Sequence, residues 1–199
     1  MIKSNTQILI IDDDLSELNP VIIKLQQLFE EVKLFSSSKD GISYVRENIS
    51  NKIILLLDVR LSKGEDGHKA LSELRNISKL IPVIIWSALD EMKEPFFDFI
   101  NNDAFAIFKK DAAISSIVEK VVDADHFLNN DIASALEQWI LKNDTDKEKP
   151  YMLSSNGKMY TLNDILREIR LQTELGKTFA SGMNKLTIEL LMRNKENLK

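Results

Sequence analysis

The sequence predicts an α/β fold in which a parallel β-sheet is covered by helices on both faces. Two observations lead to this prediction. The first is a set of four short, uninterrupted apolar runs: Ile8–Ile11, Ile53–Leu57, Val83–Trp86 and Phe105–Phe108. Runs of this kind, bounded by polar residues, are typical of strands buried on both faces. The second is the helical spacing of apolar residues between the runs, so that strands and helices alternate along the chain.

Between the apolar runs, the sequence predicts helices. The residues that recur there at intervals of three and four are Val21, Leu25, Leu28 and Phe29 in the first such segment, and Ala70, Leu71, Leu74 and Ile77 in a later one. Residues spaced in this way share one face of a helix and can pack on a sheet. Strands joined by such helices pair in parallel and are buried on both sides.

Polar residues follow the predicted strands at the points where the strands end. Asp12 and Asp13 follow the first run, Asp58 the second, Ser87 the third, and Lys110 comes shortly after the fourth. In a parallel sheet the carboxyl ends of the strands lie along one edge, and ligands bind in the crevice beyond that edge. We therefore expect these five side chains to converge.

The chemistry of these residues predicts a site that accepts a phosphoryl group. Neighbouring carboxylates raise each other's pKa unless a hard cation lies among them, and Mg²⁺ prefers oxygen ligands of this kind. With Asp12 and Asp13 on the metal, Asp58 can present a free oxygen to phosphorus and form an acyl phosphate. The Ser87 hydroxyl and the Lys110 ammonium would then bind the phosphoryl oxygens. Such a transfer needs no general base.

In their order and spacing, these motifs resemble the receiver domain of two-component response regulators. The matching stretches, which together span about residues 5–124, are Ile8–Asp14, Ile53–Leu61, Asp66–Gly67, Pro82–Ala88 and Phe105–Ala112. The resemblance implies a flavodoxin-like fold with a five-stranded parallel sheet, a bound Mg²⁺, and phosphorylation of Asp58 by a histidine kinase or a phosphotransfer protein. It also implies that the backbone carbonyl of Arg60 is a metal ligand beside Asp12, Asp13 and Asp58.

Lys109 and Lys110 compete for one role at the end of the last predicted strand. We favour Lys110, because the stretch Lys110–Ala112 resembles the Lys-Asp-Ala sequence of many receivers. The alternative for Asp12–Asp14 is a solvated loop or a helix cap, and Ser87 alone is more often only a hydroxyl at the end of a strand. The presence of all the motifs together favours the phosphate site.

The sequence departs from the receiver pattern at positions that affect signalling. Ile107 stands where the family usually has a Tyr or Phe that changes rotamer when the site is occupied. The resemblance therefore does not imply a rotamer-gated readout at this position. Arg60 and Leu89 occupy places that resemble those tuning the lifetime of the phosphoryl group in the family. Neither side chain is suited to orient an attacking water, which favours a long-lived phosphoryl state.

Phe97 and Phe108 are the candidate residues of a partner surface. In receivers, partners read phosphorylation on the surface formed by the helix before the last strand, by that strand and by the last helix. Phe97 falls off the face that Phe96 and Phe99 would bury, so it is expected to be exposed for interaction. Partial burial of Phe97 is the alternative. Phe108 belongs to the last predicted strand.

The chain is expected to have three parts. Residues 1–124 form the receiver domain, residues 125–150 a helix and a polar linker, and residues 151–199 a short hairpin followed by helices. The helix of the second part is expected over about His126–Lys142. The polar run after it is closed by Pro150, which is typical of a linker.

The C-terminal part carries its own signals of local structure. Asn156–Gly157 lies between short apolar segments, which is typical of a hairpin. Thr161 with Asp164 indicates the start of a helix. A single apolar stripe follows, and Gly176 and Gly182 are expected to break it into two helices.

The C-terminal region is expected to signal by binding a protein or by dimerising. Its 49 residues are few for an independent core, so its apolar stripe should be buried against the receiver, a second copy or another protein. The alternative is a DNA-binding module, which needs basic residues on an exposed recognition helix. The region has eight basic and five acidic residues, a modest excess. A third interpretation is a scaffold that is never phosphorylated, and the complete set of site residues argues against it.

Composition excludes several other functions. The chain has 199 residues and no cysteine, so it has neither disulfides nor thiolate metal sites. The C-terminal region has no His and no glycine-rich phosphate loop, so a catalytic output domain is not expected. The only activity expected is the acceptance and loss of phosphate at Asp58, and the protein is not otherwise an enzyme. Because no apolar stretch approaches the ~18 residues of a membrane span and no signal peptide is recognised, we expect a cytoplasmic protein.

Overall fold

The structure, a computed structural model, describes residues 3–61, 67–88, 99, 103–154 and 157–196. The chain divides into two compact units, Met1–Asn129 and Asn130–Lys199. The expected boundary at residue 124 lies inside helix α5 (Ile114–Asn130). Within the described residues, no helix is both long enough and apolar enough to span a membrane.

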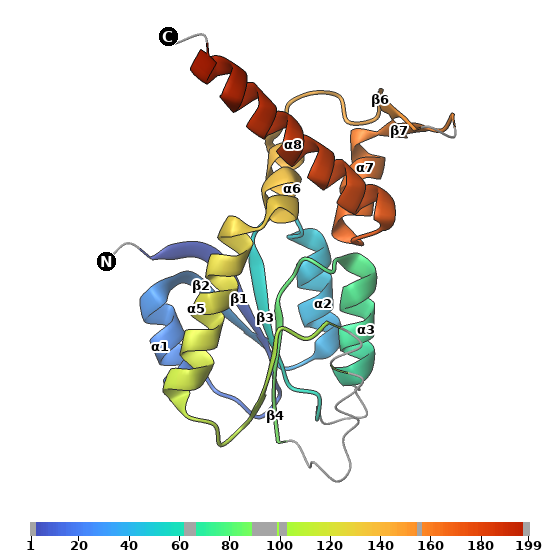
Figure 1. Ribbon diagram of the computed structural model, residues 1–199. Helices are drawn as coiled ribbons and strands as arrows, with labels where there is room; N and C mark the ends of the chain where they lie inside the picture. The colour runs from blue at the N-terminus through green and yellow to red at the C-terminus, as the bar shows by residue number, and fades with distance from the viewer. Residues whose placement is uncertain (1–2, 62–66, 89–98, 100–102, 155–156, 197–199) are drawn as a thin grey trace. The chain divides into compact units, whose positions relative to one another are not determined.

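The first unit is built on a five-stranded parallel sheet (Figure 1). The strands are β1 (Ser4–Ile11), β2 (Phe29–Phe35), β3 (Ile53–Leu57), β4 (Val83–Ser87) and β5 (Ala106–Lys109). Their order across the sheet is β2-β1-β3-β4-β5, and every neighbouring pair is parallel. This is the flavodoxin-like order, and it confirms the predicted fold.

Helices cover both faces of this sheet (Figure 1). In the described part of the first unit, they are α1 (Pro20–Leu28), α2 (Ser38–Glu47), α3 (Gly67–Ile77) and α5. On one face, α1 and α5 bury a cluster that includes Ile10 and Val121. On the other face, α2 and α3 bury a cluster that includes Ile11 and Leu74. Successive strand residues point to opposite faces, so an uninterrupted apolar run is needed to fill both clusters.

The pairing register brings the ends of the central strands to the same level. Ile11 of β1 pairs with Leu57 of β3, and Leu57 pairs with Ile85 of β4. The ladder continues one residue further, because the Asp58 N–H donates to the Ile11 carbonyl at 2.9 Å. The residues that directly follow these strands therefore lie along one edge of the sheet.

Strand β2 is an element that the apolar runs alone do not predict. The prediction that Phe29 belongs to a helix is wrong, because Phe29 begins β2 and its N–H donates to the Leu25 carbonyl where α1 ends. Apolar Val32 and Leu34 alternate with charged residues and are only partly buried. Incomplete burial is usual at the edge of a sheet, and it weakens the sequence signal of such a strand.

The second unit is mainly helical, as predicted. Its elements are α6 (Ile132–Lys142), β6 (Pro150–Leu153), β7 (Met159–Thr161), α7 (Leu162–Arg170) and α8 (Glu174–Glu196). β6 and β7 form an antiparallel pair at the place where the sequence indicates a hairpin. α7 begins with a capping box in which the Asp164 N–H donates to the Thr161 hydroxyl at 3.1 Å and the Thr161 N–H donates to the Asp164 carboxylate at 3.0 Å.

The prediction of one helix over His126–Lys142 is wrong. Helix α5 ends at Asn130, and α6 begins at Ile132. Asp131 between them has an extended backbone, and its carboxylate accepts the Ser134 N–H at 2.7 Å. An aspartate that caps a new helix in this way competes with continuation of the previous one.

Gly176 and Gly182 do not break the apolar stripe of the second unit, because both lie inside α8. The break falls at residues 171–173, where Gln172 has a φ of 51°. A Cβ at Gly176 would lie 2.3 Å from the carbonyl oxygen of Glu168 in α7, whereas a Cβ at Gly182 would meet nothing within 4 Å. Glycine at position 176 therefore lets α8 approach α7 closely.

Gly176→Ala should destabilise the second unit, and Gly182→Ala should stabilise it. A methyl group at position 176 has to push α8 away from the α7 backbone, which costs about 1–3 kcal/mol. At position 182 the same methyl group meets open space and adds helix propensity, about 1 kcal/mol. Urea unfolding followed by circular dichroism measures both changes. Equal effects at the two positions would contradict the close approach of α7 and α8.

Candidate functional site

Asp12 and Asp58 follow β1 and β3 at the same level of the sheet. The Asp12 N–H donates to the Phe35 carbonyl and the Asp58 N–H to the Ile11 carbonyl, both at 2.9 Å, so neighbouring strands hold both backbones. The two side chains are almost fully buried, with 1% and 4% of their surface exposed. Carboxylates buried in this way require hydrogen-bond donors or a cation.

Two donors bind the Asp58 carboxylate. The Ser87 hydroxyl donates to its Oδ1, and the Arg60 N–H donates to the same oxygen at 2.8 Å. Burial raises the pKa of Asp58 above its ordinary value, the two hydrogen bonds act in the opposite direction, and the charges of Asp13 and Asp14 raise it further. The Asp58 carboxylate is thus presented by three elements: β3, the turn after it and the end of β4.

Lys110 lies between the two acidic strand ends. Its Nζ forms an ion pair with Asp12 Oδ2 and lies 3.3 Å from Asp58 Oδ2. Burial lowers the pKa of Lys110 to about 8, which still leaves most of the side chain as an ammonium at neutral pH. Lys109, the alternative from the sequence, is exposed on β5.

Trp86 is a site residue that sequence analysis does not identify. Its ring centroid lies 4.8 Å from the Lys110 ammonium, a cation–π contact. Only 3% of Trp86 is exposed, and in the sequence it is simply the last residue of an apolar run. The one available signal is its position directly before Ser87, which places it near the edge where the polar side chains converge.

Asp13 completes the acidic cluster predicted to hold a metal ion. It is partly buried after β1, and its charge raises the pKa of Asp58, as expected of carboxylates that repel each other. With Lys110 paired to Asp12, no three His, Cys, Asp or Glu side chains of the described residues are arranged as a metal site. The donor set nevertheless fits Mg²⁺, because its hard carboxylate oxygens repel one another and a cation relieves that repulsion.

The start of α3 covers the turn after β3. A Cβ at Gly67 would lie 2.3 Å from the Val59 Cα and 2.7 Å from the Asp58 carbonyl oxygen. Only glycine lets α3 begin this close to the backbone of Asp58. Asp66 and Leu89, which also belong to the receiver-like pattern, lie outside the described residues.

The predicted partner surface is described only in part, because Phe97 lies outside the described residues. Phe108 pairs with Trp86 across β5 and β4, and it is partly buried against the cluster that α1 and α5 cover. Ile107 packs on the opposite face, against the cluster under α2 and α3. A partner role for Phe97 and Phe108 stays a prediction.

Comparison with known proteins assigns the first unit to a family. The family described as the response regulator receiver domain matches residues 8–122, more than half of the chain. The transcriptional regulatory protein ZraR of Salmonella typhimurium is 30% identical over 93 residues, which are 47% of this chain and 20% of that protein. ZraR of Escherichia coli K12 matches to the same extent. The chain spans about a fifth of the length of these curated relatives.

Solved structures share the fold of the first unit. A CheY-like receiver domain protein from Methanospirillum hungatei is 21% identical with a TM-score of 0.54, and the match covers 64% of this chain and 100% of that one. A chain of the CheX–CheY–BeF3–Mg²⁺ complex from Borrelia burgdorferi is 20% identical with a TM-score of 0.52, over 62% of this chain and 90% of that one. At these identities the similarity supports the fold alone, and family membership rests on the match to the family at residues 8–122. The chain belongs to the response regulator receiver domain family of two-component systems.

Proposed function

We propose that this chain is a response regulator that accepts a phosphoryl group on Asp58 from a histidine kinase or a phosphotransfer protein. One observation carries the proposal: Ser87 and Lys110, from the ends of two other strands, both reach the Asp58 carboxylate. The similar fold of a complex that contains CheY, BeF3 and Mg²⁺ supports the requirement for a metal ion. Family membership supports the choice of donor.

Each side chain at the edge of the sheet has a part in this transfer. Asp12, Asp13 and Asp58, with the Arg60 carbonyl, would hold Mg²⁺, which when bound neutralises charge on the carboxylates and the phosphoryl oxygens. An Asp58 oxygen attacks phosphorus, and the bond from phosphorus to the donor breaks with its electron pair left on the donor. The Ser87 hydroxyl, which donates to Asp58 in the structure, then donates to a phosphoryl oxygen.

Lys110 has to change partners during this cycle. Its ammonium pairs with Asp12, one of the proposed metal ligands, so lysine and metal compete for the same carboxylate. When a phosphoryl group is present, the ammonium binds one of its oxygens instead. The Trp86 ring contacts the ammonium in the structure and stabilises its charge while the anionic partner changes.

Lys110→Met should strengthen Mg²⁺ binding about tenfold and slow phosphoryl acceptance about 100-fold. The variant removes the cation that competes for Asp12, and it also removes the cation that stabilises the transferred group. Isothermal titration with Mg²⁺ measures the first effect, and the rate of phosphorylation measures the second. Lys109→Met is the matched control and should change neither. Weaker Mg²⁺ binding in Lys110→Met would contradict the competition.

The proposal is tested by incubating the full chain with acetyl phosphate in the presence and absence of Mg²⁺. We expect mass spectrometry to find one phosphoryl group, on the peptide that contains Asp58, only when Mg²⁺ is present. Hydroxylamine should remove it, because an acyl phosphate reacts with this nucleophile. Phosphorylation at another residue, or equal phosphorylation in excess chelator, would overturn the assignment.

We also propose that the C-terminal region is the output, through contact with a protein. Helix α8 exposes a set of apolar side chains, between 48% and 63% accessible: Leu186, Ile188, Leu190 and Met192. Apolar side chains gathered on one exposed segment are typical of a protein-binding surface. Size exclusion with light scattering, in the presence of Mg²⁺ and before and after the addition of beryllofluoride as a mimic of the phosphoryl group, distinguishes a second copy of the chain from a different protein. A mass increase indicates a second copy, and an unchanged mass with beryllofluoride bound indicates a different protein.

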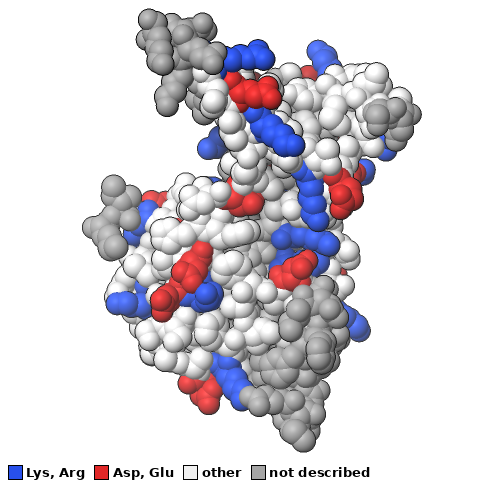
Figure 2. Space-filling model, in the orientation of Figure 1, with Lys and Arg blue, Asp and Glu red and all other residues white. Residues whose placement is uncertain are grey.

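DNA binding is the second candidate for the output. It is favoured by the excess of basic over acidic residues in 151–199 and by similarity to a transcriptional regulator, over a fifth of that protein. DNA binding requires basic side chains gathered in a patch or stripe. On the face shown in Figure 2, the described basic side chains are interspersed with acidic and uncharged ones. The face shown in Figure 2 therefore does not present the purely basic patch that DNA binding requires.

A further inference from the structure

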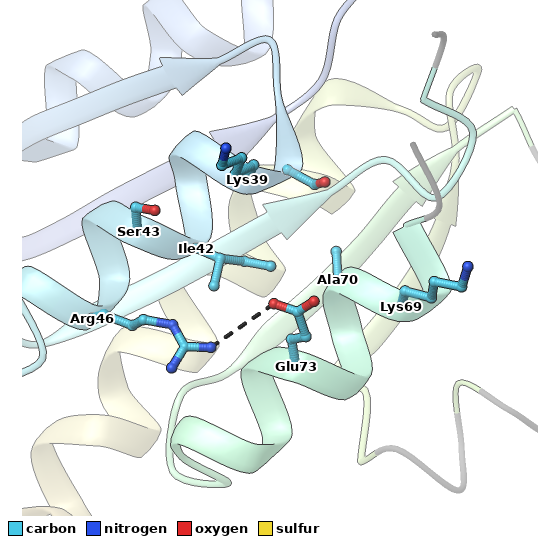
Figure 3. A pocket seen from close by; sticks show the side chains of 8 residues that line it. Lys39, Ile42, Ser43, Arg46, Lys69, Ala70 and Glu73 are labelled. Carbon is cyan, nitrogen blue, oxygen red and sulfur yellow. Dashed lines mark ion pairs between the residues drawn. The ribbon is translucent and has the colours of Figure 1, made fainter. Parts of the chain in front are cut away.

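A groove of about 250 Å³ lies between α2 and α3, on the face of the sheet that these two helices cover (Figure 3). None of the residues proposed to accept the phosphoryl group lines it. Its lining residues are Ser38, Lys39, Ile42, Ser43 and Arg46 of α2, and Lys69, Ala70 and Glu73 of α3. The buried side chains of Ile42 and Ala70 belong to the core below and give the groove an apolar floor.

The walls of this groove are predominantly cationic. Among the described residues, Lys39, Arg46 and Lys69 line it against one carboxylate, Glu73. The whole chain has the opposite balance, with 31 acidic and 26 basic residues. A local excess of positive charge in an acidic protein attracts anions, and a concave site concentrates that potential.

The cationic groups are available to a ligand. Arg46 and Glu73 form an ion pair of 3.9 Å at one end of the groove, and 58% and 59% of these side chains are exposed (Figure 3). A pair this exposed contributes little to stability, so an anion can replace Glu73 at the guanidinium with little loss. Lys39 and Lys69 form no ion pair or side-chain hydrogen bond within the described part of the chain.

The two lysines lie near the start of their helices. Both helices follow strands of the same parallel sheet, so their first turns are at the same end of the groove. Lys39 is the second residue of α2, and Lys69 is the third residue of α3. The positive ends of two helix dipoles therefore add to the two ammonium groups. Asp40, also in the first turn of α2, is not among the lining residues.

The opposite end of the groove carries a different cation. Arg46 follows Lys39 by seven residues on α2, which is two helical turns and a rise of about 10 Å. Its planar guanidinium binds a carboxylate through two parallel hydrogen bonds, whereas ammonium groups at helix starts suit a phosphate. The groove thus has two cationic ends, joined by the apolar floor.

We propose that this groove binds a small organic anion that carries a phosphate at one end and a carboxylate at the other. In Figure 3 the side chains of Lys39 and Lys69 point away from each other, so both have to turn towards the groove to bind the phosphate at the end that they flank. The carboxylate lies on Arg46 in place of Glu73. The space of about 250 Å³ lies below the ~300 Å³ where typical ligand pockets begin, which limits the ligand to a few carbon atoms.

The test is a titration of the full wild-type chain with 3-phosphoglycerate in the absence of Mg²⁺, followed by backbone amide NMR. We expect saturable shifts of the amides in residues 38–46 and 67–73. Shifts confined to the amides around Asp58 and Lys110 would overturn the proposal, because the anion would then occupy only the proposed phosphoacceptor site. No saturation of the groove amides by about 10 mM would also overturn it, since weaker binding than this is non-specific.

Variants test which groups bind the anion. Lys39→Gln with Lys69→Gln should weaken binding at least tenfold, which is about 1.4 kcal/mol. Lys24→Gln with Lys79→Gln is the control pair, because it removes the same charge from two exposed lysines outside the groove. Equal weakening by both pairs would overturn the proposal in favour of a diffuse effect of net charge.

The two ends of the ligand are tested separately. Arg46→Gln should weaken binding of 3-phosphoglycerate about tenfold and leave glycerol 3-phosphate, which has no carboxylate, unchanged. Equal loss for both molecules would overturn the assignment of the carboxylate to Arg46. These titrations do not depend on phosphorylation of Asp58, so their failure and the failure of the proposed function can be told apart.

Discussion

Asp58→Asn should abolish phosphoryl acceptance without lowering the stability of the fold. The amide retains the shape of the carboxylate and can still accept the Ser87 hydroxyl, but it provides no nucleophilic oxygen. Burial and nearby charge raise the pKa of Asp58, so the ionised carboxylate disfavours the folded state at a pH above that pKa. Its removal should leave the free energy of unfolding at neutral pH unchanged or raised.

Asp14→Asn is the matched control for this variant. It makes the same chemical change on the loop after β1, at an exposed residue to which the proposal gives no role. Phosphorylation by acetyl phosphate should be normal in Asp14→Asn and absent in Asp58→Asn. In the wild-type chain with Mg²⁺, the rate should fall once the pH is low enough to protonate Asp58, because the protonated carboxyl is a poor nucleophile. Retained phosphorylation in Asp58→Asn would refute the assignment.

Arg170→Met should lower the free energy of unfolding of the second unit by about 3–5 kcal/mol at neutral pH. Arg170 Nε donates to the Glu137 carboxylate at 2.5 Å, and only 16% and 12% of the two side chains are exposed. The pair joins α7 to α6. Removing the arginine leaves a buried carboxylate without its countercharge, which is the costly way to break a buried ion pair.

The loss in Arg170→Met should depend on pH. Burial raises the pKa of Glu137 above 4.5, and Arg170 acts against that rise, so removing Arg170 raises the pKa further. When the pKa of a carboxyl is higher in the folded than in the unfolded state, the free energy of unfolding falls as the pH rises towards the folded-state pKa. While the carboxyl is still protonated, little of that free energy is lost. Urea unfolding between pH 4 and pH 7 should therefore show a defect that grows with pH.

A second substitution separates lost charge from lost packing. Glu137→Gln combined with Arg170→Met removes both charges, and it should recover most of the stability that Arg170→Met loses at neutral pH. Glu137→Gln alone leaves Arg170 without the Glu137 carboxylate. Because Arg170 is more exposed than Glu137, this variant should lose less stability than Arg170→Met. A defect in Arg170→Met that is the same at all pH values would argue for lost packing.

The strands that position the site are predicted well from the sequence because they are buried on both faces. Burial on both faces forces every residue of β3, all but the last residue of β4 and the second half of β1 to be apolar, and such a run is hard to confuse with another element. The polar residue after each run then marks the edge of the sheet. For this reason Asp12, Asp58 and Ser87 could be placed together before their contacts were known.

Elements that are only partly buried are predicted less well. β2 lies at the edge of the sheet, so its residues need not be uniformly apolar. The end of α5 and the start of α6 form one helical pattern in the sequence, and only the capping hydrogen bond of Asp131 separates them. The role of Gly176 depends on how close it lies to the carbonyl of Glu168 in α7. The residues next to Gly176 in the sequence do not indicate this contact.

By itself, the sequence determined the fold of the first unit and the edge of the sheet where its polar residues gather, because both follow from the order of apolar runs along the chain. Tertiary structure alone decided which groups touch. The pairing of Lys110 with Asp12, its contact with Trp86 and the cationic groove between α2 and α3 all join residues that are distant in the sequence. Such contacts depend on side-chain reach and helix packing, which periodicity does not encode.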